Sequence, residues 1–142
     1  MKLSVCCLLF LALPAMAKTV EIKMLNSGKA GPMVFEPDYV KLEVGDSVVF
    51  KPADLSHNSA SSLVPTGAKP WVGVADKPLT VKFDKEGVYI YKCDPHLVMA
   101  MVGVIQVGRP VNKDAAIAEE AKLAASFVMN KDRLKKALAS VK

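Results

Sequence analysis

The chain has 142 residues, 51% of them hydrophobic and 23% charged, so its length and composition fit one globular domain with an ordinary core. The formal net charge is +5, but no lysine and arginine cluster alternates with aromatic residues, which argues against nucleic-acid binding. No apolar run reaches the roughly 20 residues that cross a bilayer. The modest positive charge suits an acidic protein partner, and it serves equally well to keep the protein soluble.

The first 17 residues have the pattern of a secretory signal peptide. Lys2 precedes an apolar run from Leu3 to Leu13, and Ala15-Met16-Ala17 forms a small-x-small end. We therefore expect cleavage after Ala17, which leaves 18–142 as a single exported domain. A short membrane anchor is the weaker alternative, because the apolar run is too short to span. Loss of Lys2 lowers the net charge by one, from +5 to +4.

Cleavage also simplifies the cysteine content. Cys6 and Cys7 leave with the signal peptide, so Cys93 is the single thiol of the exported chain. A lone cysteine in an exported protein has no partner for an internal disulfide. Cys93 is therefore buried and inert, chemically reactive, or a metal ligand.

Residues 18–108 alternate between apolar and polar side chains in short pieces, separated by turn residues at 26–32, 44–47 and 84–87. This pattern predicts an antiparallel β-sandwich or barrel. The strand-like pieces are 19–25, 39–44, 47–50, 79–83, 87–93 and 101–107. In the piece 87–93, Cys93 shares one face with Tyr89 and Tyr91, so it points inward if that face is the core.

The segment 51–78 is long, rich in proline, serine and glycine, and has no clear period. A connection of this length in a compact domain is usually functional or contains small elements of its own. It carries His57 and Trp71, the chain's one tryptophan. We expect Trp71 to anchor the loop by packing.

The tail, residues 111–142, is rich in alanine and contains neither proline nor glycine. Its apolar spacing predicts two helices, the second beginning near Asn130 and Asp132. We expect both apolar stripes to pack on the sheet or on each other, with partner binding as the weaker alternative. The first stripe comprises Ile117, Ala121, Ala124 and Val128, and the second comprises Leu134, Ala137, Leu138 and Val141.

Chemistry-bearing residues gather between Tyr91 and Met101. Cys93, His96 and Met101 follow the spacing C-x2-H-x4-M, with Pro95 stiffening the turn between the first two. Thiolate and imidazole suit copper, zinc or iron, and a methionine thioether favours copper. With His57 supplied by another loop at the same end of the sandwich, the set becomes two histidines, one cysteine and a weak axial methionine. That set is typical of a blue-copper electron-transfer site.

Each residue also has an ordinary structural explanation. Cysteine is among the most buried residue types, a loop histidine is usually solvated, and Met99 and Met101 could simply pack. These explanations are weaker jointly, because the single exported Cys and one of two His lie three residues apart.

The chain resembles the pseudoazurins, a family of small periplasmic cupredoxins. The resemblance implies a mainly β fold, a cupredoxin Greek-key β-sandwich or barrel over 18–108 with two C-terminal α-helices over 111–142. The matching stretches, in order, are "VEIKMLN" at 20–26, "MVFEP" at 33–37, "HN" at 57–58, "YKCDPH" at 91–96 and "MAMVGVIQVG" at 99–108.

The resemblance also assigns the site. It implies that one copper ion is bound by His57, Cys93, His96 and Met101, which leaves Met99 as a neighbour. Three further residues surround the ligands. Asn58 is expected to secure the ligand loop and direct its N–H at the cysteine sulfur, Met33 to lie close to His96, and Pro95 to shape the surroundings.

Two positions depart from the family pattern. Leu55 stands where a lysine is frequent, which weakens a positive docking ring that Lys69 and Lys92 keep in part. Asp94 stands where threonine is common. A carboxylate near the metal favours Cu(II), so we expect Asp94 to lower the reduction potential.

The expected function is electron transfer without catalysis. By resemblance, the acceptor is a periplasmic nitrite reductase and the donor a c-type cytochrome or similar carrier, and a monomer suits such a shuttle. A copper enzyme needs further histidines and an open position, and the chain has no third histidine. A periplasmic copper chaperone or storage protein is the remaining alternative, although such proteins usually expose their ligands.

Overall fold

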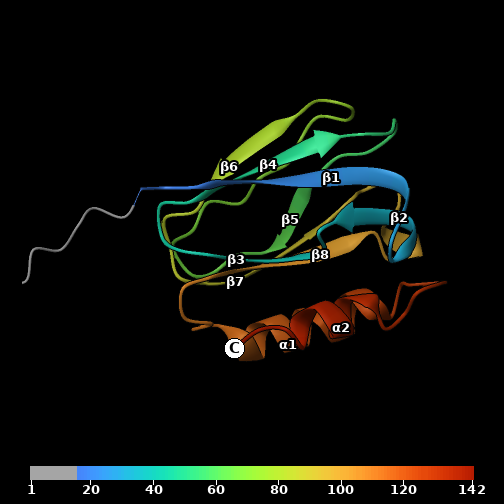
Figure 1. The fold of residues 1–142 in the computed structure, drawn as a ribbon. Coiled ribbons are helices and arrows are strands. Elements are labelled where there is room, and N and C mark those ends of the chain that lie inside the picture. The colour runs from blue at the N-terminus through green and yellow to red at the C-terminus, as the bar shows by residue number, and fades with distance from the viewer. Residues whose placement is uncertain (1–15) are drawn as a thin grey trace, which may run out of the picture.

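The computed structural model describes residues 16–142 (Figure 1). Most of the predicted signal peptide, with Cys6 and Cys7, falls at 1–15 and therefore lies outside the described residues. Within 16–142, no helix is both long enough and apolar enough to traverse a bilayer.

The described chain folds into two four-stranded sheets, which pack face to face with the helices on one outer side (Figure 1). The first sheet has the order β2-β1-β4-β6 and the second has the order β3-β8-β7-β5. The strands are β1 (Thr19–Gly28), β2 (Gly31–Glu36), β3 (Tyr39–Leu42), β4 (Ser47–Pro52), β5 (Ala60–Leu63), β6 (Leu79–Lys82), β7 (Gly87–Lys92) and β8 (Val102–Val107).

The sheets are mixed, which corrects the expectation of a purely antiparallel arrangement. Strand β1 pairs in parallel with β4, and β3 pairs in parallel with β8. The chain leaves the first sheet for β3 and returns at β4, so β4 comes to lie beside β1 in the same direction. The expected sandwich with two C-terminal helices is confirmed.

Strands β7 and β8 are buried on both faces because they lie between two cores. On β7, Tyr89 and Tyr91 point into the core between the sheets, together with Cys93 at the strand end. Val88 and Ile90 point the other way, toward the helices. The predicted inward direction of Cys93 is therefore confirmed. Successive side chains of β7 point to opposite faces of the sheet, so this one strand contributes to both cores.

Two strands were not predicted. Strand β2 begins inside a stretch whose Gly and Pro indicated only a turn, and β5 lies in the long segment 51–78. Trp71 anchors that segment as expected. Its side chain is 8% exposed and stacks on Phe50 with ring centroids 6.0 Å apart, and its indole N–H donates to Ser59 Oγ at 3.1 Å.

The two helices, α1 (Lys113–Ala124) and α2 (Arg133–Leu138), cover the outer face of the β3-β8-β7-β5 sheet (Figure 1). The stripe predicted for the second helix is confirmed, because Leu134, Ala137 and Val141 are buried against this sheet.

The stripe predicted for the first helix was wrong except at Ala124, which is partly buried against the same core. Ile117 and Val128 are 53% and 72% exposed, and the packing is made instead by Ala116, Leu123 and Phe127. Asn112, just before α1, explains the difference. Its side chain accepts from the Val88 N–H at 2.7 Å and donates to the Val88 carbonyl at 2.9 Å, which fixes the rotation of the helix. Val128 lies beyond the last helical residue, so helical spacing does not apply to it.

Candidate metal centre

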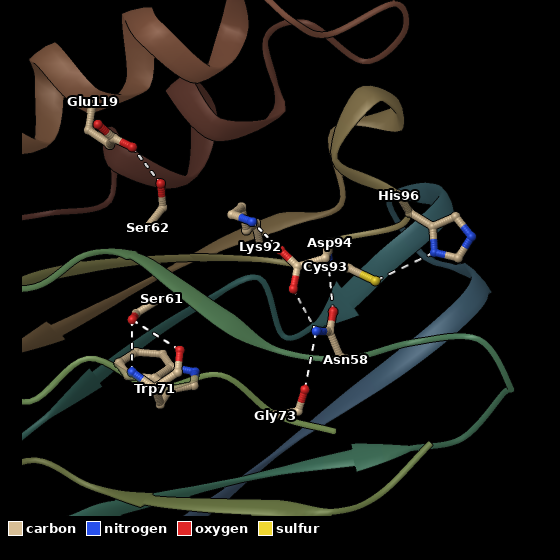
Figure 2. A network of polar contacts seen from close by, with 10 residues as sticks. All are labelled: Asn58, Ser61, Ser62, Trp71, Gly73, Lys92, Cys93, Asp94, His96 and Glu119. Carbon is tan, nitrogen blue, oxygen red and sulfur yellow. Dashed lines mark hydrogen bonds and ion pairs between the residues drawn. The ribbon is translucent and has the colours of Figure 1, made fainter. Parts of the chain in front are cut away.

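Three predicted ligands meet at one end of the sandwich. The donor atoms of His57, Cys93 and His96 all lie within 4.8 Å of one another. Cys93 Sγ is 3.8 Å from His57 Nδ1 and 3.5 Å from His96 Nδ1. Figure 2 shows the His96 ring directed at the sulfur. Residues 36 positions apart in the chain are thus brought to a single point.

The ligand loop is closed by backbone hydrogen bonds. The Cys93 N–H donates to the Met101 carbonyl at 2.9 Å, and the Met101 N–H donates to the His96 carbonyl at 3.2 Å. Between them, Leu97–Met99 form one 3-10 turn, and Ala100 ends it in the left-handed conformation with φ of 58°. Met101 is fully buried in the same core cluster as Cys93. A short loop therefore carries three of the four predicted ligands.

His57 is held from both sides. The backbone N–H groups of Ser56 and His57 donate to Asp76 Oδ1 at 2.6 and 3.2 Å, and the Asp76 N–H donates back to the His57 carbonyl at 2.9 Å. The ring Nε2 lies 3.0 Å from Asn26 Oδ1. Because an amide oxygen only accepts, Nε2 carries the proton and Nδ1 presents its lone pair toward Cys93.

Asn58 joins the two ligand-bearing segments (Figure 2). Its side-chain oxygen accepts from the Asp94 N–H at 2.8 Å. Its amide nitrogen donates to Asp94 Oδ2 at 2.7 Å and to the Gly73 carbonyl at 3.2 Å. One buried amide thus fixes the residue after His57 to the residue after Cys93.

Burial governs the protonation of the two innermost ligands. It raises the pKa of the Cys93 thiol, while hydrogen bonding from the backbone of Asn58 and His96 acts in the opposite direction. Burial also lowers the pKa of His57, with a smaller contribution in the same direction from His96. The neutral imidazole that a metal needs is therefore the favoured form of His57, and a metal has to displace the Cys93 proton.

The arrangement fits a single metal ion. Bonds of about 2.0–2.3 Å to nitrogen and sulfur bring neighbouring ligand atoms to separations of about 3.5–4 Å. The sulfur to nitrogen distances of 3.5 and 3.8 Å meet that condition. Two imidazoles and a thiolate beside a buried methionine form the donor set of a blue-copper site, and a thioether is an unusual ligand for zinc.

Comparison with known proteins agrees with this donor set. The family of copper binding proteins described as plastocyanin/azurin matches residues 22–108. A pseudoazurin from Paracoccus pantotrophus is 44% identical over 112 residues, which covers 77% of each chain. The chain belongs to the pseudoazurins.

Two further pseudoazurins support this membership. The one from Methylorubrum extorquens is 48% identical over 98 residues, covering 68% of this chain and 66% of that relative. The crystal structure of native pseudoazurin from Hyphomicrobium denitrificans matches with a TM-score of 0.75 at 38% identity, covering 87% of this chain and 98% of the other. Copper is therefore the metal of this pseudoazurin-type protein, at a type 1 site of His57, Cys93, His96 and Met101.

The remaining predicted site residues lie around this pseudoazurin centre. Met33 packs against the core cluster that contains Cys93 and Met101, and Pro95 is an exposed residue of the loop. Lys92 forms an ion pair with Asp94 (Figure 2). That ion pair reduces the charge available for docking.

Lys69 lies further from the ligands. It lines a cavity together with Trp71, Phe83 and Tyr89. Tyr89 is four residues before Cys93 along the chain, or roughly 13 Å at the rise of a strand. Lys92 is adjacent to Cys93 in the chain, so its position fits a docking role at the metal end better than that of Lys69 does.

Sequence reasoning missed Asn26 and Asp76. Asn26 orients the His57 ring, and Asp76 fixes the His57 backbone. Asn26 is the last residue of the stretch "VEIKMLN", which marked it as part of the resemblance without giving it a role. Nothing in the spacing of Asp76 distinguished it from an ordinary loop aspartate.

Proposed function

We propose that this protein is a one-electron carrier of the periplasm that uses one copper ion and transforms no substrate. The convergence of His57 with Cys93 and His96 in a buried pocket is the observation that carries the proposal. Bound copper would supply a couple between Cu(II) and Cu(I). The chain's own residues supply the fixed positions, the exclusion of water and the route to a partner.

The ligands are held by contacts that do not involve a metal. Asn26 orients the His57 ring, and Asn58 ties the two ligand segments together. His57, Cys93 and Met101 have no exposed surface, so water does not reach them. Ligands fixed in this way change position little when the charge of the site changes, and little reorganisation favours fast electron transfer. With copper bound, the Cys93 thiolate and the Met101 thioether would tune the reduction potential.

His96 is the ligand through which electrons would leave and enter. Of the four ligands, His57, Cys93 and Met101 are fully buried, whereas His96 is partly exposed. A partner docked at this end would approach the ring directly, and a small interface suits a brief encounter. We propose a periplasmic nitrite reductase as acceptor and a c-type cytochrome or similar carrier as donor, with Lys92 and Lys69 as docking candidates and a monomer as the working form.

A copper chaperone or storage protein is the second candidate. Such a protein would release its metal readily, and exposed ligands would favour that release. Full burial of three ligands argues for retention instead.

One titration separates the two functions. The purified protein is given one equivalent of Cu(II), and its visible absorption is followed through reduction by ascorbate and reoxidation by ferricyanide. We expect an intense colour that bleaches and returns without loss of copper. A colourless protein that binds only Cu(I) and passes it to a chelator would favour the chaperone.

A further inference from the structure

Arg133 is the first residue of α2, and its side chain is buried, with 6% of the residue exposed. Its guanidinium donates four hydrogen bonds, all to backbone carbonyls and none to a carboxylate. Nη1 donates to Met33 at 2.7 Å and to Ala100 at 2.9 Å. Nη2 donates to Ala30 and Pro32, each at 3.1 Å.

Two of these carbonyls belong to residues in an unusual conformation. Met33 has φ of 48° and Ala100 has φ of 58°, a left-handed region that is costly for residues other than glycine. Ala100 immediately precedes the ligand Met101, and Met33 packs against the cluster that contains Met101 and Cys93. The guanidinium therefore stabilises the strained backbone next to Met101, at Ala100, and the strained backbone at Met33, which packs against the same cluster.

Other residues of the tail also donate hydrogen bonds to the ligand loop. Val128 N–H donates to the Val98 carbonyl at 2.8 Å, and Asn130 Nδ2 lies 3.4 Å from the Met99 carbonyl. With Arg133 on Ala100, three successive carbonyls of the ligand loop accept from the C-terminal tail. No residue of the tail is itself a ligand, so the tail can position the ligands only through backbone contacts of this kind.

The chemistry of the side chain explains why arginine suits this place. A buried cation is costly unless its donors are satisfied, and the rigid planar guanidinium can serve several acceptors at once. A lysine ammonium keeps the charge but is a single point with three donors, so it cannot span four carbonyls. The carboxylates of Asp38 and Asp132 lie near enough to offset part of the charge.

We propose that Arg133 is a positioning residue of the copper site, which sets the place of the Met101 sulfur by holding the Ala100 carbonyl. The C-terminal helices thus act on the metal and not only on the sheet that they cover. This inference rests on the proposed function, because it needs copper at the four ligands.

The test compares four variants of the whole protein, loaded with Cu(II). Arg133→Lys keeps the positive charge but loses the planar guanidinium and its several donors. Arg133→Gln loses both the charge and the guanidinium. Asn130→Gly removes one loop contact but allows the φ of 50° found there, so it stays informative if the Arg133 variants do not fold. Val141→Ala is the matched control, buried at 3% exposure in the same tail core.

The control acts away from the metal. The residue after Val141, Lys142, bonds to Gln106 through its backbone N–H and carbonyl. Gln106 lies four residues along β8 from Val102, or about 13 Å from the metal end. Val141→Ala should therefore lower the melting temperature without touching the loop.

We expect both Arg133 variants to change the visible absorption and paramagnetic resonance spectra of Cu(II). We also expect them to lose copper to a chelator faster, by about tenfold if a loss of metal affinity at the lower end of the range for residues that orient ligands appears wholly in the release rate. Asn130→Gly should shift both readouts less, in the same direction, and Val141→Ala should keep the wild-type spectra.

Wild-type spectra and release rates in the Arg133 variants, or in Asn130→Gly if those do not fold, would overturn the proposal. Equal spectral changes in Val141→Ala would also overturn it, because the effect would then be general destabilisation. If the wild-type protein itself develops no colour with Cu(II), the proposed function fails instead.

Discussion

The two histidines of the site face the same sulfur from opposite kinds of surroundings. His57 is fully buried, its ring is held by Asn26 and its backbone by Asp76. His96 lies in a loop and is partly exposed, and its ring is directed at Cys93 at 3.5 Å. One side of the pocket is fixed by the fold, and the other opens to solvent.

This difference corresponds to two requirements of an electron carrier. Ligands must not relax when the charge of the site changes, and a partner must come close to at least one of them. The chain meets the first requirement with hydrogen bonds around His57 and the second with the position of His96. Substitutions at the shared sulfur, beside His57 and at the remote end of the sandwich separate the contributions of these regions.

The largest expected effect follows removal of the sulfur that both histidines share. Cys93→Ser should abolish the intense visible absorption of the Cu(II) protein, because the colour depends on the thiolate. Met99→Leu is the control, since Met99 is the neighbouring methionine that we do not assign as a ligand. An absorption spectrum of each variant decides the point. Persistent colour in Cys93→Ser, or its loss in Met99→Leu, would show that the ligands are assigned wrongly.

A smaller effect is expected on the fixed side. Asn26→Ala removes the acceptor of the His57 Nε2 proton and frees the ring. Changes of this kind cost 10- to 100-fold in metal affinity, and we expect about tenfold here because Asn26 borders solvent. Competition with a Cu(II) chelator measures the change. Ser27→Ala, on the adjacent and exposed position, should leave the affinity unchanged, and an equal loss there would discount the role of Asn26.

The end of the sandwich remote from the copper should affect stability and not colour. Asp46 precedes β4 there, and hydrogen bonds from the backbone N–H groups of Glu43 and Lys18 lower its pKa below the ordinary 3.8. A lowered pKa means that the carboxylate stabilises the fold above its ordinary pKa, and that this contribution is lost as the pH falls through the folded-state value.

Asp46→Asn should therefore lower the melting temperature by a few degrees at pH 7, and the difference from wild type should shrink in acid below pH 4. Thermal unfolding across this pH range measures it, and the spectrum of bound Cu(II) should not change. A melting difference that persists undiminished in acid would mean that the charge of Asp46 is not the cause.

The smallest effect concerns Asp94. Its carboxylate accepts from Asn58 and pairs with Lys92 (Figure 2), so much of its charge is already offset. Asp94→Thr should still raise the reduction potential, but only slightly, and more at low ionic strength. A redox titration of both proteins at two salt concentrations tests this. An unchanged or lowered potential would contradict the expected effect of the carboxylate.

Much of the site could be predicted because three ligands lie within nine residues. Cys93, His96 and Met101 share one loop, so their spacing together with the upstream "HN" and the strand pattern indicates a metal, and the alternation of "GVYIYKC" indicates which way the sulfur points. His57 was assigned as the other histidine of the exported chain, on a second loop, and the "HN" of the family supported that assignment. Asn26 and Asp76 escaped detection because they reach His57 across 31 and 19 residues of chain, through contacts that leave no local pattern.

The fold was predicted less completely than the site. The strands with clear apolar–polar alternation were predicted. Strands β2 and β5 were missed because they contain glycine, proline or serine, which are typical of turns. The buried face of α1 was wrong because Asn112 sets the helix rotation by bonding to Val88 on a distant strand. The faces of an alanine-rich helix differ little in hydrophobicity, so the spacing of its apolar residues does not predict a rotation that such a contact sets.

The most direct test is the paramagnetic resonance spectrum of the protein loaded with one equivalent of Cu(II). We predict the small copper hyperfine splitting of a metal bound covalently to one thiolate and two imidazoles, lost in Cys93→Ser. A wide splitting, as given by copper bound only through nitrogen and oxygen, would contradict the convergence of these ligands on one ion.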